Sequence, residues 1–148
     1  RSRFKQLTTD IQQLNKKIIA EFRANNGVVG GQFENMPILL LETVGAKSGA
    51  RRVIPLAYFS HEDRHLIVGS FGGSPKNPPW YYNVMVNPEV VVEVGSEKYT
   101  AHAEVLDEPE RTEMYSKLES QIPMFKQYRE NIERTIPVVA LNRSKTLP

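Results

Sequence analysis

The chain has 148 residues, of which 40% are hydrophobic and 24% charged, with no cysteine and a formal net charge of +2. These values are ordinary for one globular domain over residues 1–148 and argue against a collagen-like, coiled-coil or disordered chain. The lack of cysteine excludes disulfides, cysteine-ligated metals and a thiol nucleophile. No apolar run approaches the ~20 residues of a membrane-spanning helix.

The basic residues are unevenly distributed along the chain. Residues 1–52 contain nine Lys or Arg and four acidic residues, whereas residues 53–148 contain ten and thirteen. The basic part could bind an anionic ligand or a membrane surface, or it could be an ordinary solvated surface. The net charge is too small to indicate a nucleic-acid partner.

An amphipathic helix is predicted over residues 8–25, within an N-terminal segment 1–26. Its apolar positions recur every three or four residues, at Leu7, Ile11, Leu14, Ile18 and Phe22. A polar residue among 8–10 is expected to cap its start, and Asn25-Asn26-Gly27 to stop it. Packing on the domain is the usual role of such a stripe. Because the opposite face is basic, contact with a membrane surface is the alternative.

Six strands are expected after this helix, mostly joined as antiparallel hairpins. They cover residues 37–44, 52–59, 65–70, 89–94, 98–106 and 135–141. Pro55 places the second strand at a sheet edge or a bulge. Helices are expected at 80–86, from Asp107 (as the cap) to about 120, and from 123 to about 133. Because strands and helices do not alternate, the pattern favours a closed or partly closed barrel over residues 37–142.

The segment His61-Glu62-Asp63-Arg64-His65 matches the zinc-protease pattern H-E-x-x-H. That chemistry requires both histidines on one face of a helix. Here the pattern lies between two strand-like runs that are too close together to leave room for a helix. We therefore predict a polar hairpin turn and no metal site.

The turn from Gly45 to Arg52 combines glycines with basic side chains. It lacks the adjacent Gly-Lys pair of the phosphate-binding loop in nucleoside triphosphate hydrolases, so it does not predict triphosphate hydrolysis. Exposed backbone N–H groups beside Lys47, Arg51 and Arg52 could nevertheless bind a phosphate or a carboxylate. A solvated turn fits this segment equally well.

The stretch from Ser70 to Asn83 is the most informative one. Its two glycines let the backbone approach a flat ligand, and the helix that begins at Pro78-Pro79 favours an anion at its N-terminus. The aromatic run 80–82 could stack on a ligand, although Trp80 and one tyrosine are equally suited to a core. Together with the basic turn, this stretch predicts a ligand site.

These segments resemble the deazaflavin (coenzyme F-420)-dependent nitroreductase and quinone reductase family over nearly the whole chain. The matching residues are Gly30 to Phe33, Gly45, Lys47, Ser48, Gly49, Arg52, Pro55-Leu56, Gly72-Gly73, Lys76-Asn77-Pro78, Trp80-Tyr81, Asn83, Asn87-Pro88 and Arg134 to Pro137. The resemblance implies a mainly β, largely antiparallel split barrel of the FMN-binding-like type. It also implies coenzyme F-420, which carries a phosphate and an oligoglutamate tail.

The resemblance further implies roles for individual residues. Lys47 and Arg52 would hold the phosphate and nearby carboxylates. The remaining cofactor-binding residues would be Val53, Ile54, Pro55, Gly72, Gly73, Lys76, Asn77, Pro78, Trp80 and Tyr81, with Asn83 shaping the loop. Ser70 would donate to the acceptor oxygen. Tyr128 would be a proton donor or an orienting hydroxyl, and would line the substrate pocket with Ile122 and Phe125.

The chain departs from the best-known nitroreductase type at several of these positions. Ala46 and Phe71 stand where basic residues occur there, and Ile122 and Phe125 replace pocket tyrosines. A more apolar pocket favours a quinone or another lipophilic electrophile over a nitroimidazole. The expected activity is therefore hydride transfer from reduced F-420 to such an acceptor.

Two alternatives to this activity stay open. One is an FMN-binding split-barrel oxidoreductase, because the basic turn suits a flavin phosphate equally. The other is a non-catalytic deazaflavin-binding or lipid-binding protein. The expected location is cytoplasmic, with peripheral contact to the inner face of the cell membrane through residues 8–25 as an option. The sequence leaves the oligomeric state open.

Overall fold

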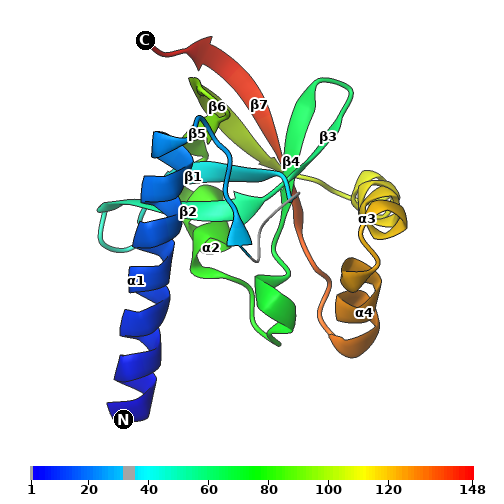
Figure 1. The fold of residues 1–148 in the computed structure, drawn as a ribbon. Helices are drawn as coiled ribbons and strands as arrows, with labels where there is room; N and C mark the ends of the chain where they lie inside the picture. Colours follow the sequence, from blue (N-terminus) through cyan, green and yellow to red (C-terminus); the bar gives the residue numbers. More distant parts are fainter. Residues whose placement is uncertain (1, 32–35) are drawn as a thin grey trace.

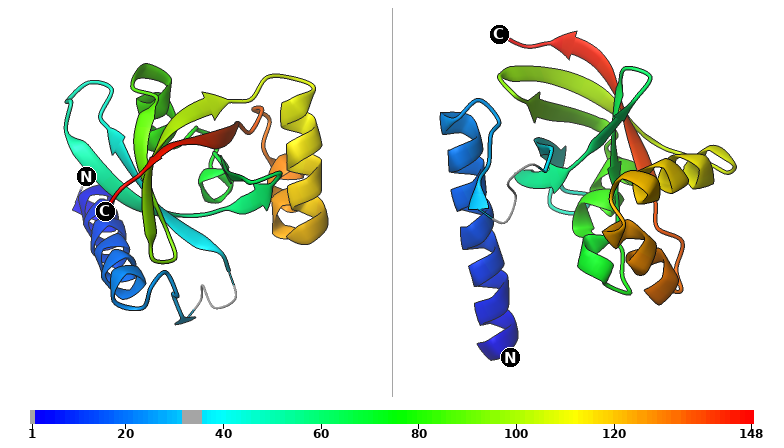
Figure 2. Two further views of the ribbon diagram at one scale, coloured as in Figure 1. Left: turned by 90° about the horizontal axis from the view of Figure 1, so that it is seen from above. Right: turned by 45° about the vertical axis from the view of Figure 1, so that its right-hand side comes forward.

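The computed structural model describes residues 2–31 and 36–148, with side chains described from residue 10 onward. Within these residues a single curled sheet of seven strands is flanked by four α-helices (Figures 1 and 2). The helices are α1 (Ser2–Ala24), α2 (Pro79–Val86), α3 (Glu110–Gln121) and α4 (Met124–Asn131), and a short 3-10 helix, η2, covers Phe71–Gly73. The strands are β1 (Ile38–Val44), β2 (Arg51–Ala57), β3 (Phe59–His61), β4 (Arg64–Val68), β5 (Glu89–Val94), β6 (Glu97–Val105) and β7 (Val138–Thr146).

The sheet is antiparallel throughout and forms a split barrel, as predicted. Its strand order is β2-β1-β5-β6-β7-β4-β3, so β2 and β3 are the two edges. A single residue, Tyr58, connects these edge strands along the chain, and its amide donates to the carbonyl of Pro37 at 3.1 Å. The edge position of β2 explains how Pro55 is accommodated, because its missing N–H faces away from the paired side.

Three apolar clusters hold the helices on the sheet. Trp80 and Val84 of α2 enter the barrel interior with Leu39 and Leu41 of β1. A second cluster lies beneath α3 and α4, and a third packs Phe22 of α1 against the opposite face of β1. Strand β1 is therefore buried on both faces, which explains why its sequence is a continuous apolar run without alternation.

The sheet has seven strands instead of the six predicted from sequence. The expected strand 52–59 is divided at Tyr58, and Phe59–His61 forms its own strand against β4. Glu62 and Asp63 make the hairpin turn in the left-handed region, with φ of 51° and 65°. The predicted turn between Ser60 and Arg64 was therefore too long, although the hairpin itself is confirmed.

The last strand begins three residues later and ends five residues later than expected from sequence. Before β7, the carbonyl of Ile136 accepts from the Arg111 side chain at 3.0 Å, and that of Pro137 accepts from Gly69 N at 2.9 Å. The Arg111 contact holds this segment beside α3, and Pro137 has no N–H with which to continue the ladder. Beyond Leu141 the strand is polar but continues to pair with β6, and apolar periodicity cannot detect such an extension.

Helix α1 begins at Ser2, six residues before the predicted start, so none of residues 8–10 is its cap. No glycine or proline interrupts residues 2–24, and nothing in the sequence stops the helix from extending in this direction. Its end is as predicted: Asn26 and Gly27 are left-handed, and Gly27 N donates to Phe22 O at 2.8 Å.

Only the C-terminal half of α1 packs on the barrel, and the N-terminal half extends beyond it (Figure 2). Ile18 and Phe22 are buried at 7% and 1% exposure, whereas Ile11 and Leu14 are 50% and 44% exposed. Leu7, the first residue of the predicted stripe, lies outside the described side chains. Among the described helices, none is both long and apolar enough to cross a membrane.

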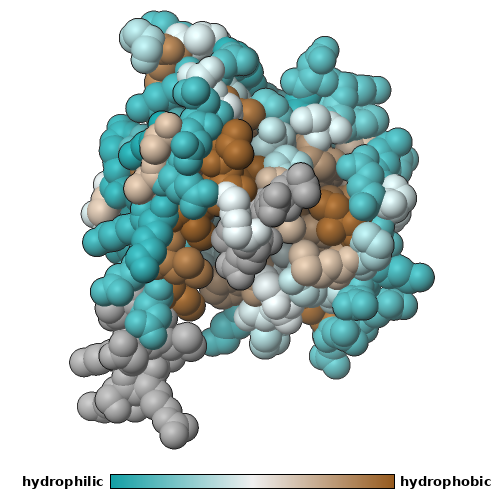
Figure 3. Space-filling view, in the orientation of Figure 1, coloured by the Kyte–Doolittle hydropathy of each residue, from teal (hydrophilic) through white to brown (hydrophobic). Residues whose placement is uncertain are grey.

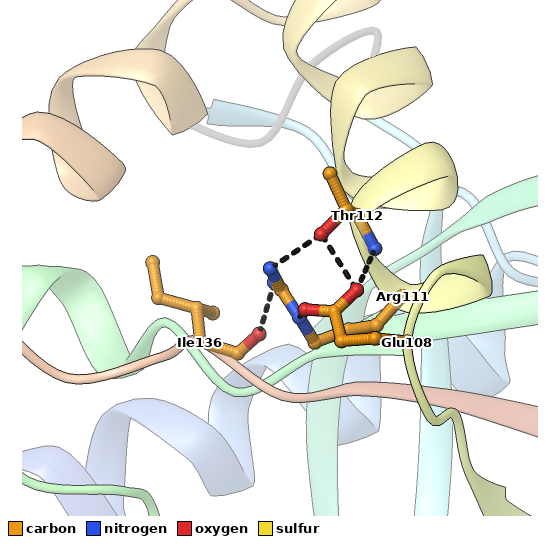
Figure 4. A network of polar contacts seen from close by, with 4 residues as sticks. All are labelled: Glu108, Arg111, Thr112 and Ile136. Atoms are coloured by element: carbon orange, nitrogen blue, oxygen red, sulfur yellow. Dashed lines mark hydrogen bonds and ion pairs between the residues drawn. The ribbon is translucent and has the colours of Figure 1, made fainter.

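The side chain of Glu108 caps the first turn of α3. The prediction that Asp107 is the capping residue is wrong. The Glu108 carboxylate accepts from Thr112 N at 3.0 Å, from the Thr112 hydroxyl at 2.6 Å and from Arg111 Nε at 2.8 Å (Figure 4). Arg111 in turn donates to the carbonyl of Ile136. The network therefore anchors the first turn of α3 to the segment that leads into β7.

Candidate functional site

The basic turn between β1 and β2 is closed by its own backbone. Gly45 N donates to Ala50 O at 2.8 Å, and Gly49, at φ 71°, donates to Gly45 O at 3.0 Å. Lys47 and Arg52 are exposed and have no hydrogen bond or ion pair within the described part of the chain. Two cations without counterions on one turn are suited to bind an anion.

Arg52 and Arg51 lie on opposite faces of β2. Arg52 pairs across the strands with Thr43, which is buried and bonded to α2, so Arg52 lies on the face that carries α2. Arg51 lies on the other face, 3.7 Å from the Glu42 carboxylate. Arg51 therefore cannot add its charge to the face on which Arg52 lies.

Helix α2 connects the basic turn to the glycine-rich stretch. Asn83 accepts from Ala46 N at 3.0 Å and donates to Thr43 Oγ1 at 3.2 Å, and Asn87 donates to Val44 O at 3.3 Å. The two segments predicted to share a ligand site are therefore adjacent. Within α2, Trp80 is only 5% exposed in the barrel core, so its ring is a packing group; Tyr81 is half-buried beside it.

The loop over residues 70–78, which we call the glycine loop, has an unusual backbone. Phe71, Gly72 and Gly73 are all left-handed, with φ of 50°, 61° and 87°. A residue such as Phe71 adopts this conformation only at a cost of about 1–2 kcal/mol. Gly72 borders open space, since a Cβ there would meet nothing within 4 Å among the described atoms. The loop ends at Pro78, which precedes the first turn of α2.

Ser70 is at the start of the glycine loop and is 8% exposed. Its carbonyl accepts from Gly73 N and from Arg134, but its hydroxyl makes no hydrogen bond within the described residues. The Tyr128 hydroxyl, on α4, likewise has no partner there. These two hydroxyl groups are therefore free to bond to a bound molecule.

Helix α4 brings Tyr128 to the glycine loop. A Cβ added to Gly73 would be 3.2 Å from the Tyr128 ring. Phe125, which was expected to line the pocket, is 5% exposed and lies in the cluster beneath α3 and α4. Its carbonyl accepts from the buried Tyr115 hydroxyl at 2.6 Å, and burial raises the pKa of Tyr115 to about 12. Ile122 is half-buried at the end of α3.

Arg134 is a component of the site to which the sequence analysis gave no role. It lies between α4 and β7 and donates to Ser74 O from Nε and Nη2, to Ser70 O from Nη2 and to Asn77 Oδ1 from Nη1, at 2.6–3.2 Å. Burial lowers the pKa of its guanidinium. Its place beside Thr135-Ile136-Pro137 in the family motif was the only available signal, and that signal did not indicate what it contacts.

The H-E-x-x-H segment forms the β3–β4 hairpin, so its histidines are not on a helix. His61 shares a face with Phe59, whereas His65 neighbours Leu66, the partner of Phe59, and so points to the opposite face. His65 bonds to the Tyr99 hydroxyl at 2.7 Å, and burial lowers its pKa. The described residues contain no group of three potential metal ligands.

Taken together, the fold and this site define a split-barrel protein with a cationic turn and a glycine loop on one side of the sheet. A sequence profile described as F420H(2)-dependent quinone reductase matches residues 14–143. A relative from Mycobacterium tuberculosis (strain H37Rv), named F420H(2)-dependent quinone reductase, is 34% identical over 128 residues, which cover 84% of this chain and 86% of the relative.

Solved structures agree with this assignment. One, described as an F420-H2 dependent reductase, is 36% identical with a TM-score of 0.66, and the match covers 72% of this chain and 94% of that one. Another, described as a domain-swapped dimer, is 33% identical with a TM-score of 0.68, over 91% of this chain and 99% of that one. This chain belongs to the F420H(2)-dependent quinone reductase family. The resemblance inferred from the motifs is thereby confirmed.

Proposed function

We propose that this chain is an F420H2-dependent oxidoreductase that reduces a quinone or a similar lipophilic electrophile. Family membership supports both the cofactor and the acceptor class. The observation that carries the proposal for this particular chain is a pair of hydroxyls, on Ser70 and Tyr128, that have no hydrogen-bond partner among the described residues and belong to segments that meet at Gly73. Gly72, in the same loop, borders open space, and we propose that the flat ring of the cofactor binds there.

The residues present fit the deazaflavin cofactor. Lys47 and Arg52 have no counterions of their own among the described residues and would bind the phosphate and the acidic tail. Lys76 is exposed on the glycine loop and would add a third cation. The backbones of Val53–Pro55 and Gly72–Asn77 would line the ring system, with Pro78 and Tyr81 behind the loop. When bound, the reduced cofactor supplies the hydride.

The protein contributes positioning and electrostatics to the reaction. Ser70 would donate a hydrogen bond to the acceptor oxygen as negative charge develops there. Tyr128 would orient the acceptor or deliver the proton that completes reduction. Ile122 and the ring of Tyr128 would form the apolar wall, while Phe125 would support Tyr128 from the core through their edge-to-face contact at 5.6 Å.

A lipophilic acceptor also fits the surface on this side of the molecule. Figure 3 shows apolar side chains gathered between α1 and the part of the molecule that carries α3 and α4. We propose that α1 shields the entrance to the acceptor site from water, since its N-terminal half carries exposed Ile11 and Leu14. Peripheral contact of α1 with an anionic membrane is a second proposal, supported by the exposed basic residues Lys16 and Lys17 just past the middle of the helix.

The whole chain, residues 1–148, is proposed to act as one domain. A dimer is the assembly that the relatives suggest, because one similar structure is described as a domain-swapped dimer. We propose a cytoplasmic location, where a reduced cofactor would be supplied.

The decisive experiment combines binding and turnover. Oxidised F-420, FMN and heme are titrated into the purified protein, and menadione reduction is measured with reduced F-420. Preferential binding of F-420, together with turnover that falls at least about ten-fold in Ser70→Ala, is the expected result. Preferential FMN binding would favour the flavin alternative, and F-420 binding without turnover would favour a carrier protein.

A further inference from the structure

The glycine loop is held in place mainly by one side chain that lies outside it. Its three consecutive left-handed residues are supported internally by only two backbone hydrogen bonds, Gly73 N to Ser70 O at 3.0 Å and Ser74 N to Phe71 O at 3.1 Å. Phe71 has no intrinsic preference for this conformation. A backbone of this kind persists only when its surroundings determine it.

The side chain of Arg134 holds the loop in this conformation. Its guanidinium reaches the loop at its first residue, in its middle and near its end, through Ser70 O, Ser74 O and the Asn77 side chain. The three acceptors are far enough apart in sequence that fixing them together fixes the loop between them. A planar guanidinium with several donors in fixed directions can do this, whereas a lysine ammonium cannot engage all three in the same way.

Arg134 is also unusual in its electrostatic environment. Every acceptor that it reaches is an uncharged oxygen, and no carboxylate pairs with it in the part of the chain that the structure describes. Arg111 on α3 and Arg129 on α4 are both paired with glutamates. The charge of Arg134 is therefore left to act on whatever binds at the loop.

Arg134 also links the two halves of the site. It follows α4, which places Tyr128 on Gly73, and precedes the segment that Arg111 anchors through Ile136 O. The Ser70 carbonyl that it holds belongs to the residue whose hydroxyl is unpartnered. A shift of this guanidinium would move the cofactor loop and the acceptor donor together.

We infer that Arg134 is a positioning residue that sets the conformation of the glycine loop and, through Ser70, aligns the acceptor with the cofactor. The loop-setting part depends only on contacts within the chain; the alignment part rests on the proposed function. The inference gives Arg134 a role distinct from that of Lys47 and Arg52, which would bind the cofactor directly.

The test compares Arg134→Lys, which keeps the charge, with Arg129→Lys, a matched change on α4 where Arg129 pairs with Glu119. Amide hydrogen exchange at Gly73 and Ser74 is measured without cofactor, followed by F-420 affinity and kcat and KM for menadione. In Arg134→Lys we expect at least about ten-fold faster exchange, about ten-fold weaker F-420 binding and a lower kcat. Arg129→Lys should stay within about two-fold of the parent protein in each quantity.

A second variant, Arg134→Ala, is assayed with and without millimolar guanidinium chloride, with sodium chloride at the same ionic strength as control. Partial recovery of slow exchange and of F-420 affinity by guanidinium alone supports the positioning role. Exchange and affinity in Arg134→Lys within about two-fold of the parent would overturn the inference. If the parent protein does not bind F-420 but exchange still accelerates in Arg134→Lys, the proposed function fails while the loop-setting role stands.

Discussion

The ring of Tyr128 lies against Gly73 so closely that a Cβ on this glycine would be 3.2 Å from the ring's Cδ1 and 3.3 Å from its Cε1. The contact joins α4 to the glycine loop and leaves little room for a side chain at position 73. It therefore determines how far the Tyr128 hydroxyl stands from the loop that is proposed to bind the cofactor.

We predict that Gly73→Ala reduces kcat/KM for menadione by at least about ten-fold, because the added methyl displaces Tyr128 from the site. Gly31→Ala is the matched control: φ at residue 31 is also positive, at 62°, and a Cβ added there, outside the proposed site, would have no described atom within 4 Å. Both variants incur the left-handed strain of about 1–2 kcal/mol, so their difference isolates the Tyr128 contact. Equal losses in the two variants would show that the position of Tyr128 does not matter.

Arg52 and Arg51 offer a second matched pair. Arg52→Ala should weaken F-420 binding roughly ten- to a hundred-fold, since a charge-assisted bond is worth about 1.5–3 kcal/mol. Arg51→Ala, on the other face of β2 beside Glu42, should change affinity little. Fluorescence titration at two salt concentrations measures both, and affinity should fall with salt. A similar loss in both variants would indicate only a general effect of positive charge.

Substrate choice should depend on Ile122 more than on Phe125. A nitro group needs hydrogen-bond donors as charge develops, and one such donor is worth about a hundred- to a thousand-fold in rate. Ile122→Tyr should therefore raise nitroimidazole turnover relative to menadione turnover by at least about ten-fold. Both positions replace tyrosines of the nitroreductase type, but Phe125 is buried. Phe125→Tyr should accordingly lower stability without changing the substrate ratio, and the ratio of kcat/KM values decides the point.

The Glu108 cap makes a pH-dependent contribution to stability. Hydrogen bonds from the Thr112 side chain and from Arg111 lower the pKa of Glu108 to about 2, from an ordinary value of 4.5. A lowered carboxyl pKa stabilises the fold above pH 4.5, and this stabilisation is lost as the pH falls toward 2. Glu108→Gln should therefore lower Tm at pH 7, with a smaller difference at pH 3.

Glu113→Gln serves as the control for this measurement. Glu113 is exposed on the same helix, and its side chain forms no hydrogen bond or ion pair within the described residues. Its replacement should leave Tm nearly unchanged at both values of pH. If Glu108→Gln lowered Tm as much at pH 3 as at pH 7, the contribution of Glu108 to stability would not depend on its charge.

Local sequence patterns could predict the hairpins and the positions of most elements. Alternating and continuous apolar runs located β1, β5 and β6, and Pro55 indicated an edge or a bulge, of which the structure has the edge. The patterns could not locate β3, because three residues are too few for a period. They also missed the polar end of β7. Backbone pairing with β6 keeps this end in the sheet, and burial of apolar side chains does not.

The candidate site was predictable as two segments but not as a structure. Asn83 binds the basic turn through Ala46 N, and Arg134 binds the glycine loop from 57 or more positions away. Such contacts depend on how the sheet curls, which no local pattern reports. Trp80 shows that a motif alone does not separate binding residues from core residues. Its position in the motif was compatible with ligand binding, whereas its burial makes it part of the core.

The two edge strands that Tyr58 connects also bear on how copies of this chain can associate. Strands that lack a neighbour usually offer their unpaired backbone to other molecules. Here the two such strands are β2, which contains a proline, and β3, which has only three residues. Neither offers a long row of free donors and acceptors, so the sheet resists growth by strand addition. Strand addition at these two edges is therefore a poor route to self-association of this protein.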